Sequence, residues 1–206
     1  MMVGRGRPRS FDRDAALRRA MEVFWERGYE GTSLSDLTAA MGINSPSLYA
    51  AFGCKEALFR EAVALYSEVE GAATNRAMSD EPTARRAVEA MLRGNVEGYA
   101  APGKPSGCMI VLAATLGTPE NERVRAYLAG CRRAALDALR RRLDRGVVEG
   151  DVPAGTDTAA LAAFYTTVLQ GLSLQARDGA SREALQAIVD CAMAAWETLA
   201  RPRAAV

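Results

Sequence analysis

The stretch "GINSPSLYAAFGCKEALF", residues 42–59, contains two glycines that bracket a very short apolar and aromatic segment. Ser45 and Pro46 stand before that segment. Serine is a favourable N-cap, and proline suits the first helical position because no N–H is needed there. A helix of about seven residues is too short to be stable alone, so tertiary contacts must hold it. We therefore predict a short helix that is supported from behind and exposed in front.

Two further helices are predicted before this stretch. Apolar residues recur at helical spacing from residue 11 to residue 27, and Gly28 ends that pattern. A second helix follows Thr32 or Ser33 and ends at Gly42, where we expect a sharp turn in which a side chain would clash. This is the helix-turn-helix pattern, whose last helix lies in the major groove of DNA. Its outer face is small or polar apart from one tyrosine: Asn44, Ser45, Ser47, Tyr49 and Ala50.

The rest of the chain also has helical periodicity, with no strand pattern. One helix is predicted from residue 55 to about residue 77. Breaks rich in proline and glycine then separate five segments, at roughly 83–100, 106–116, 120–147, 157–177 and 182–200. We predict an all-α fold: a flexible basic arm over 1–10, a three-helix head with the helix-turn-helix over 11–55, and a helical body of five to six helices over 56–206 that binds ligand and dimerises.

Composition limits the possible functions. The net charge is only +1, so bulk charge does not indicate a nucleic-acid partner, and any such partner must be argued locally. The chain has no histidine, which argues against a helical di-metal enzyme, and its four cysteines lie far apart. We expect no catalysis, metal or cofactor. With no apolar leader and no apolar run of about 18 residues, we expect a cytoplasmic protein without a membrane segment.

The segment "ALRRAMEVFWERGYEGTSLSDLTAAMGINSPSLYAAFGCKEALF" resembles the DNA-binding head of the tetracycline-repressor-like (TetR) transcriptional regulators. The resemblance implies that Thr32, Tyr49 and Lys55 contact phosphates and that residues 45–50 face base edges. It also implies a ligand pocket and a dimer interface in the body, and we assign the interface to the last two helices. The complete set of predicted DNA-binding residues is Arg5, Arg7, Arg9, Thr32, Ser33, Asn44, Ser45, Pro46, Ser47, Tyr49, Ala50 and Lys55.

The predicted function is a ligand-responsive regulator, acting as a homodimeric repressor that leaves a palindromic double-stranded operator when a small molecule binds. Few charged residues are candidates for burial in the body, which favours an apolar or aromatic effector. Six side chains are candidates for the ligand cavity, although a plain core would explain them equally: Met91, Met109, Leu112, Tyr127, Phe164 and Tyr165.

Two features leave alternatives open. Arg5, Arg7 and Arg9 resemble the core of an AT-hook, which follows a narrow minor groove, but such an arm can equally be a solubilising tail. Cys54 stands near a helix N-terminus beside Lys55, and Cys108 follows a Gly/Pro loop. Either thiol could sense oxidants or electrophiles, or be an ordinary small residue. A helical protein that mediates only protein contacts is the remaining alternative.

Overall fold

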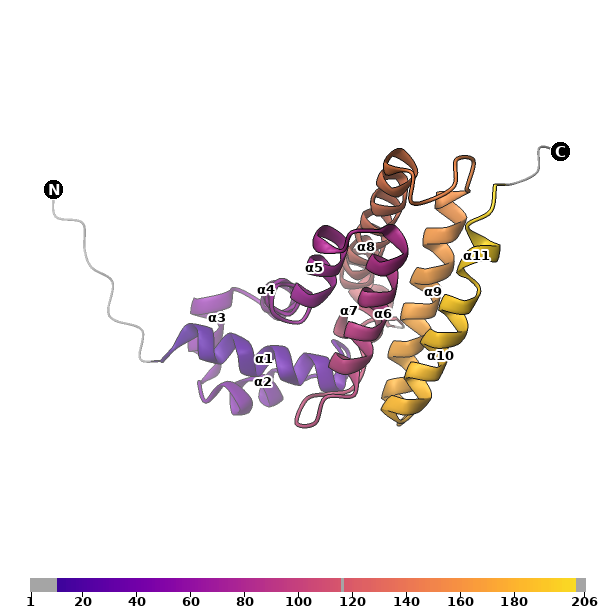
Figure 1. Ribbon diagram of the computed structural model, residues 1–206. Coiled ribbons are helices and arrows are strands. Elements are labelled where there is room, and N and C mark those ends of the chain that lie inside the picture. Colours follow the sequence, from indigo (N-terminus) through magenta and orange to yellow (C-terminus); the bar gives the residue numbers. More distant parts are fainter. Residues whose placement is uncertain (1–10, 116, 203–206) are drawn as a thin grey trace, which may run out of the picture.

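The computed structural model describes residues 11–115 and 117–202, and within those ranges the chain is helical (Figure 1). The β-structure in these ranges is confined to one isolated antiparallel β-bridge, between Thr156 and Pro202. The predicted all-α fold is confirmed. The arm with Arg5, Arg7 and Arg9 lies outside the described residues.

The first four helices are bounded by local signals. Ser33 and Asp36 form a reciprocal capping box at the second helix, and Gly28, Gly42 and Gly53 end the first three with positive φ angles. The bounds are α1 Arg13–Arg27, α2 Leu34–Met41, α3 Ser45–Phe52 and α4 Lys55–Val69.

The remaining helices form the larger part of the molecule, with α9 and α10 side by side at the end opposite α2 and α3 (Figure 1). The bounds are α5 Ala72–Asp80, α6 Ala84–Tyr99, α7 Met109–Leu112, the 3₁₀ turn η1 Pro119–Asn121, α8 Glu122–Glu149, α9 Thr158–Arg177, α10 Arg182–Ala194 and α11 Trp196–Leu199.

Three predicted helices are shorter than expected. The helix predicted over 55–77 breaks into α4 and α5 at Gly71, where a Cβ would collide with the carbonyl oxygen of Ser67. Of the segment predicted over 106–116, the described residues 106–115 are α-helical only over the four residues of α7. The carbonyl of Ala113 there accepts a hydrogen bond from the Tyr29 N–H at 2.8 Å, so the chain is bonded to the turn that follows α1 instead of continuing its own helix. The segment predicted over 182–200 divides into α10 and α11.

Two hydrophobic cores hold these helices. The body core draws its buried residues from Ala77 to Ala200, all within α5 to α11 and their connections. The head core is built on α1 to α4, but it also includes Met109 and Val124 with Leu128, from α7 and α8. The head is therefore completed by residues far along the sequence, and the cores do not divide at residue 55.

The arginine-rich stretch of α8 contains one buried side chain that amphipathic periodicity did not indicate. Arg142 is only 3% exposed, and its Nη2 donates to the carbonyl of Glu81 at 3.1 Å. It fastens the turn between α5 and α6 to α8. The other arginines of this stretch are exposed or half-buried, as expected for the wet face of a long helix.

Candidate nucleic-acid interface and the cavity behind it

The short helix α3 is supported from behind and exposed in front. Leu48 is fully buried and Phe52 nearly so, while Tyr49 on the opposite face is 47% exposed. The Arg13 guanidinium lies over the Phe52 ring at 4.3 Å and reaches the Ala51 carbonyl and the Glu61 carboxylate. These contacts hold a helix that could not persist alone, so the face with Tyr49 is fixed and free to meet another molecule.

The N-cap of α3 is Asn44 and not Ser45. The Oδ1 atom of Asn44 accepts a hydrogen bond from the backbone N–H of Ser47 at 2.9 Å, and the helix begins at Ser45 with Pro46 in its first turn. Asparagine and serine are about equally favourable N-caps. Asn44 is the N-cap here because its backbone is extended, whereas Ser45 is already helical. Asn44, Ser45, Pro46 and Ala50 are exposed and Ser47 is half-buried, which leaves the first turn open to a phosphate.

Gly42 makes the turn between α2 and α3, for a different reason than predicted. The nearest atom to a Cβ built on Gly42 is Nη1 of Arg19 at 3.6 Å, which is ordinary contact. The backbone there has φ +67° and ψ +33°, a left-handed conformation that side chains disfavour. Glycine is therefore required by the backbone conformation and not by crowding.

Two residues predicted to contact DNA at the start of α2 use their hydroxyls in hydrogen bonds within the protein. Thr32 is buried and its hydroxyl donates to the Gly28 carbonyl at 2.6 Å. The exposed Ser33 shares its hydroxyl with Asp36, donating to Oδ2 at 2.6 Å and accepting from the Asp36 N–H at 3.1 Å. Both hydroxyls therefore stabilise the head directly, and contact with DNA by either remains a prediction.

Lys55 is placed at the N-terminus of α4, half-buried against Tyr29. Its Nζ lies 4.3 Å from the ring centroid of Tyr29. Burial lowers the pKa of Lys55, against opposing effects of Glu30 and Asp36. The stacking fixes the ammonium near the α3–α4 junction, which suits the predicted phosphate contact.

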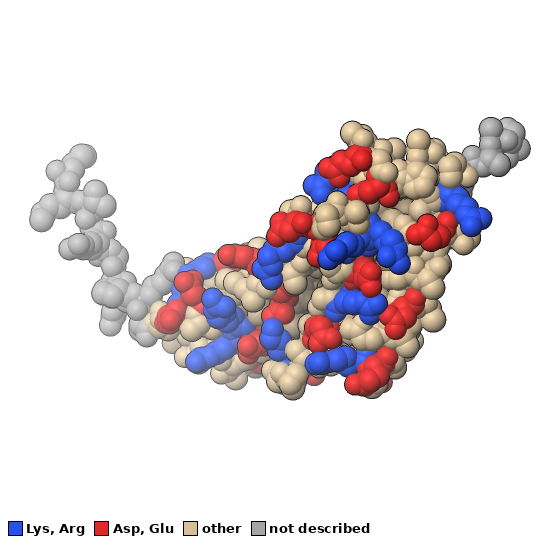
Figure 2. Space-filling model, viewed as in Figure 1, with Lys and Arg blue, Asp and Glu red and all other residues tan. Residues whose placement is uncertain are grey.

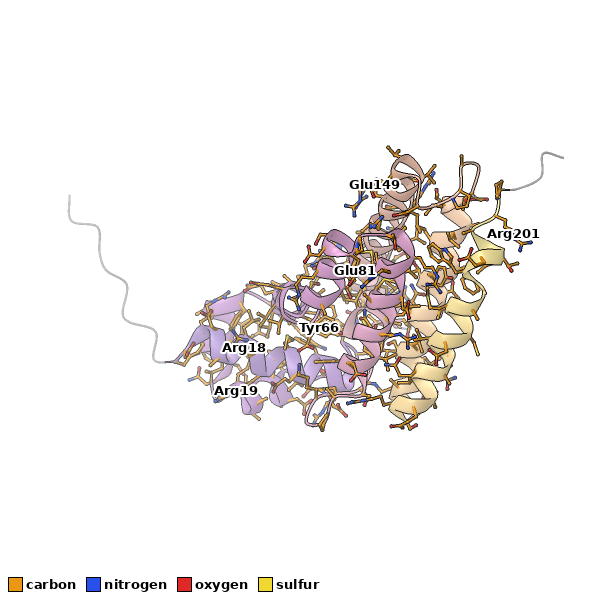
Figure 3. All side chains as sticks on the ribbon, in the orientation of Figure 1. Arg18, Arg19, Tyr66, Glu81, Glu149 and Arg201 are labelled. Carbon is orange, nitrogen blue, oxygen red and sulfur yellow. The ribbon has the colours of Figure 1, made fainter. Side chains whose placement is uncertain are left out.

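Two exposed arginines of the head lie outside the predicted DNA-binding set. Arg18 and Arg19 are exposed on α1 (Figure 3), and Arg19 lies beside the turn at Gly42. Over the face shown in Figure 2, acidic and basic side chains are interspersed. Any positive charge that attracts DNA must therefore be confined to a small part of the surface.

The six predicted ligand residues differ in burial and in the core to which they belong. Met91 and Tyr165 lie in the body core, whereas Met109 lies in the head core. Tyr165 packs against Trp196 and donates to the Ala192 carbonyl at 3.1 Å; burial raises its pKa to about 12. Leu112 and Tyr127 are half-buried, and Phe164 is 38% exposed on α9. Their assignment to a ligand cavity remains a prediction, beside the alternative that they are plain core residues.

A small, partly enclosed cavity lies between α1, α4, α5 and α6, where Tyr66 projects between the head and the body (Figure 3). Its volume is about 20 Å³, close to the space of one water molecule. Asn95 and Thr74 both line this cavity, and the Asn95 side-chain amide donates a hydrogen bond to the Thr74 hydroxyl at 2.7 Å. The nine lining residues are Trp25, Tyr66, Glu70, Ala73, Thr74, Gly94, Asn95, Gly98 and Tyr99.

A larger open groove of about 580 Å³ runs between the head and the loop that follows α6. Lys104 of that loop is ion-paired to Glu70, with 2.7 Å between Nζ and Oε1. The groove shares Trp25 and Glu70 with the small cavity. Its lining residues are Arg19, Met21, Glu22, Val23, Trp25, Glu26, Arg27, Ala40, Glu70, Gly103, Lys104 and Pro105.

The two candidate thiols have different surroundings. Cys54 is exposed and is the N-cap of α4, with Sγ accepting from the Ala57 N–H at 3.4 Å. Cys108 is half-buried and touches both cores, with its sulfur against the hydroxyls of Tyr66 and Tyr99. Burial, followed by the influence of Cys108, raises the pKa of both tyrosines.

The end of α1 is bound to the body by several hydrogen bonds. Trp25 Nε1 donates to the Gly107 carbonyl at 2.8 Å. Arg177, the last residue of α9, donates from Nη2 to the Trp25 carbonyl at 2.8 Å and from Nη1 to the Glu26 carbonyl at 2.9 Å. A guanidinium at the C-terminal end of a helix also complements the helix dipole. The loop 105–108 and α9 are therefore tied to the same end of α1.

Comparisons with known proteins agree with this arrangement. Residues 16–62 match the family described as bacterial regulatory proteins, tetR family, and residues 82–192 match the tetracyclin repressor-like C-terminal domain. The chain is 34% identical over 199 residues to the HTH-type transcriptional repressor ComR of Escherichia coli (strain K12), a match that covers 96% of this chain and 94% of ComR. It is 32% identical over 192 residues to the HTH-type transcriptional regulator YezE of Bacillus subtilis (strain 168), covering 91% and 97%.

A solved structure gives the same result in three dimensions. The fold is similar to that of a cysteine-substituted form of the TetR-family regulator CifR complexed with 26-base-pair operator DNA, with a TM-score of 0.91 and 51% identity over 93% of this chain and 100% of that chain. In the residues that the structure describes, no helix is long and apolar enough to cross a membrane. The exposed α3 helix, its glycine turn and these matches show that the chain belongs to the TetR family of bacterial transcriptional regulators.

Proposed function

We propose that this regulator is a ligand-responsive repressor that binds a palindromic operator as a homodimer and is released when a small molecule enters the body. The observation that carries the proposal is the exposed face of α3, with Tyr49 and the open first turn, on a helix fixed from behind by Leu48 and Phe52. Its relatives ComR and CifR are a named repressor and a regulator solved with operator DNA. Such a protein would act in the cytoplasm, where its operator lies.

The dimer interface is proposed at α9 and α10. Exposed large apolar side chains occur on these two helices and on α11, namely Phe164, Leu174, Ile188 and Leu199. An apolar face of this kind is what a second copy covers in a symmetric helical dimer. Phe164, predicted to line a ligand cavity, is better explained as part of this interface. A two-fold dimer then presents two α3 helices to successive major grooves.

The effector site is proposed at the small cavity and its boundary with the groove. Trp25 and Tyr66 meet there with ring centroids 4.9 Å apart, so the cavity joins the head to α4 and α6. A cavity of about 20 Å³ must open to admit a ligand. Gly94 and Gly98 on α6 leave room for that movement because they carry no side chain. Opening the cavity would displace Trp25 and so favour a different head position.

The test is selection of bound sites from a random duplex pool, followed by anisotropy titration of the enriched palindrome. Tyr49→Ala should lower operator affinity by roughly tenfold or more, because aromatic contact with the duplex is lost, while the melting temperature stays within about 2 °C. Val148→Ala, at an exposed position of α8, is the control and should alter neither quantity. The proposal would be contradicted if the parent protein enriched no duplex sequence from the pool, or if the Tyr49→Ala variant bound the operator with normal affinity.

A thiol-sensing regulator is a second candidate, favoured by one observation. The sulfur of Cys108 lies against the hydroxyls of Tyr66 and Tyr99, two residues that line the cavity, and the Cys108 N–H donates to the Ser173 hydroxyl of α9 at 2.8 Å. Adding a group to this thiol would displace the adjacent Gly107, whose carbonyl holds Trp25. Oxidant or alkylating agent should then release the parent protein from operator but leave Cys108→Ser bound, and equal release of both would exclude this mechanism.

A further inference from the structure

The wall between the small cavity and the groove consists of two side chains that each make a specific contact. The indole of Trp25 is close to perpendicular to the Tyr66 ring, at 79°, and its N–H is bonded to Gly107. Glu70 directly follows α4, and its carboxylate accepts a hydrogen bond from the Lys104 ammonium at 2.7 Å. Lys104 therefore closes the groove side of this wall.

Glu70 gives this wall a definite charge. Among the nine described residues that line the small cavity it is the single charged one. Its side chain is 16% exposed, whereas that of Lys104 is 46% exposed. A shielded carboxylate beside aromatic rings favours a positive partner, because water screens the pair less and ring faces attract cations. Lys104 supplies that positive charge from a long, half-solvated side chain.

We infer that the effector is a small organic cation, an amine or quaternary ammonium with an aromatic or aliphatic body, whose charged group replaces the Lys104 ammonium at Glu70. Its body lies in the groove against Met21, Val23 and Pro105. The groove volume of about 580 Å³ falls within the roughly 300–1,000 Å³ typical of small-molecule sites. This inference rests on the proposed function, which places the effector at this wall.

The other charges of the groove do not oppose a cation. Arg19 and Arg27 are balanced by Glu22 and Glu26, all four exposed on α1. Arg27 is also neutralised by Asp36, with 2.7 Å between its Nη1 and Oδ1. The preference of the site for one sign of charge is therefore set by the more shielded Glu70.

The cation would be coupled to the DNA-binding head through Trp25. This residue belongs to α1, and its bond to Gly107 is one of the ties between head and body. A cation that takes the place of the Lys104 ammonium at Glu70 would break the ion pair that joins the loop 103–105 to the end of α4 and would shift the loop or the neighbouring indole. Either movement changes the attachment of α1, so this site can bias the position of α3.

The experiment titrates three benzene derivatives of different charge: benzyltriethylammonium, neutral benzyl alcohol and anionic benzenesulfonate. The chain has two tryptophans, so a Trp196→Phe background leaves Trp25 as the fluorescent reporter. The cation should bind most tightly. Glu70→Gln should weaken its binding roughly tenfold or more, and Lys104→Met should strengthen it several-fold by removing the competing ammonium. In the Glu70→Gln background, Lys104→Met should give no gain, which a purely structural effect would not reproduce.

Arg182→Met is the matched control, since Arg182 is ion-paired to Glu97 at 3.0 Å and neither residue lines the cavity or the groove. It should leave cation affinity unchanged. Tighter binding of benzenesulfonate or benzyl alcohol than of the cation, or a cation affinity indifferent to Glu70→Gln, would overturn the inference. Operator binding is measured separately without any of these compounds. If the parent protein does not bind operator, the proposed function is contradicted. If it binds operator but shows no preference for the cation, only this inference is contradicted.

Discussion

The head and the body of this regulator are stabilised in different ways. The body core is self-contained, because its buried residues come from Ala77 onward. The head core is not, because α7 and α8 supply Met109, Val124 and Leu128 to it. The comparison teaches that the head is partly an extension of the body. A change in residues 107–128 therefore reaches the DNA-binding helices through shared packing.

The largest expected effect compares two leucines of α8 that are both fully buried, Leu128 in the head core and Leu143 in the body core. Either leucine changed to alanine should lower the free energy of unfolding by about 3 kcal/mol, from lost transfer energy and a cavity. Leu128→Ala alone should also reduce hydrogen-exchange protection in α1 and α3, and weaken operator binding. Equal loss of head protection in both variants would refute the asymmetry between the cores.

The next effect concerns the loop that joins α6 to α7. Gly107 has φ +76°, and a Cβ there would lie 2.5 Å from the Ser173 carbonyl oxygen of α9. Gly107→Ala should therefore cost about 2 kcal/mol or more in thermal unfolding. Gly103→Ala is the control, with φ +78° and no atom within 4 Å, so it should show only the cost of the backbone conformation, about 1 kcal/mol. If both changes cost the same, the packing of this loop on α9 is unimportant.

A smaller effect is expected from Arg177, which binds the end of α1 from α9. Arg177→Lys keeps the charge but cannot donate to the Trp25 and Glu26 carbonyls in the same forked geometry, and should cost about 1–2 kcal/mol. Because α9 is proposed to dimerise, the variant should also tolerate a wider range of half-site spacings in operator titrations. Arg182→Lys, at an exposed ion pair, should change neither quantity. An unaltered spacing preference would show that this tie is merely structural.

The smallest effect is at the junction of α3 and α4. The thiol of Cys54 caps α4 with a sulfur acceptor at 3.4 Å from the Ala57 N–H. A serine hydroxyl is a stronger cap, so Cys54→Ser should raise the free energy of unfolding by up to about 1 kcal/mol. Chemical denaturation of both proteins checks this, with Cys191→Ser on exposed α10 as the control. A destabilised Cys54→Ser protein would mean that the thiol contributes more than the cap.

Much of the head was predictable because its signals are local. A capping residue and a terminal glycine mark α2 and α3, and both lie within a few residues of the helices that they bound. The buried Leu48 and exposed Tyr49 follow directly from helical periodicity. The choice of Asn44 over Ser45 as N-cap was not predictable, because both residues suit the position.

The proposed effector site could not be predicted in the same way. Trp25, Glu70 and Lys104 come from three separate parts of the chain, and their pairing depends on how α1 packs against α4 and the loop after α6. Periodicity suggested Met91 and Tyr165 because large apolar residues were expected to face inward. They do, but they fill a core and line neither cavity.

The sequence by itself determined an all-helical chain with a short, capped helix exposed at Tyr49, since caps, glycines and periodicity act within a few residues. Only the tertiary structure decided that α7 and α8 complete the head, that Arg142 is buried, and that a carboxylate, an ammonium and an indole meet at one wall. The physical reason is that these features are contacts between distant segments, whose energies depend on packing and burial in three dimensions and leave no periodic trace in the chain.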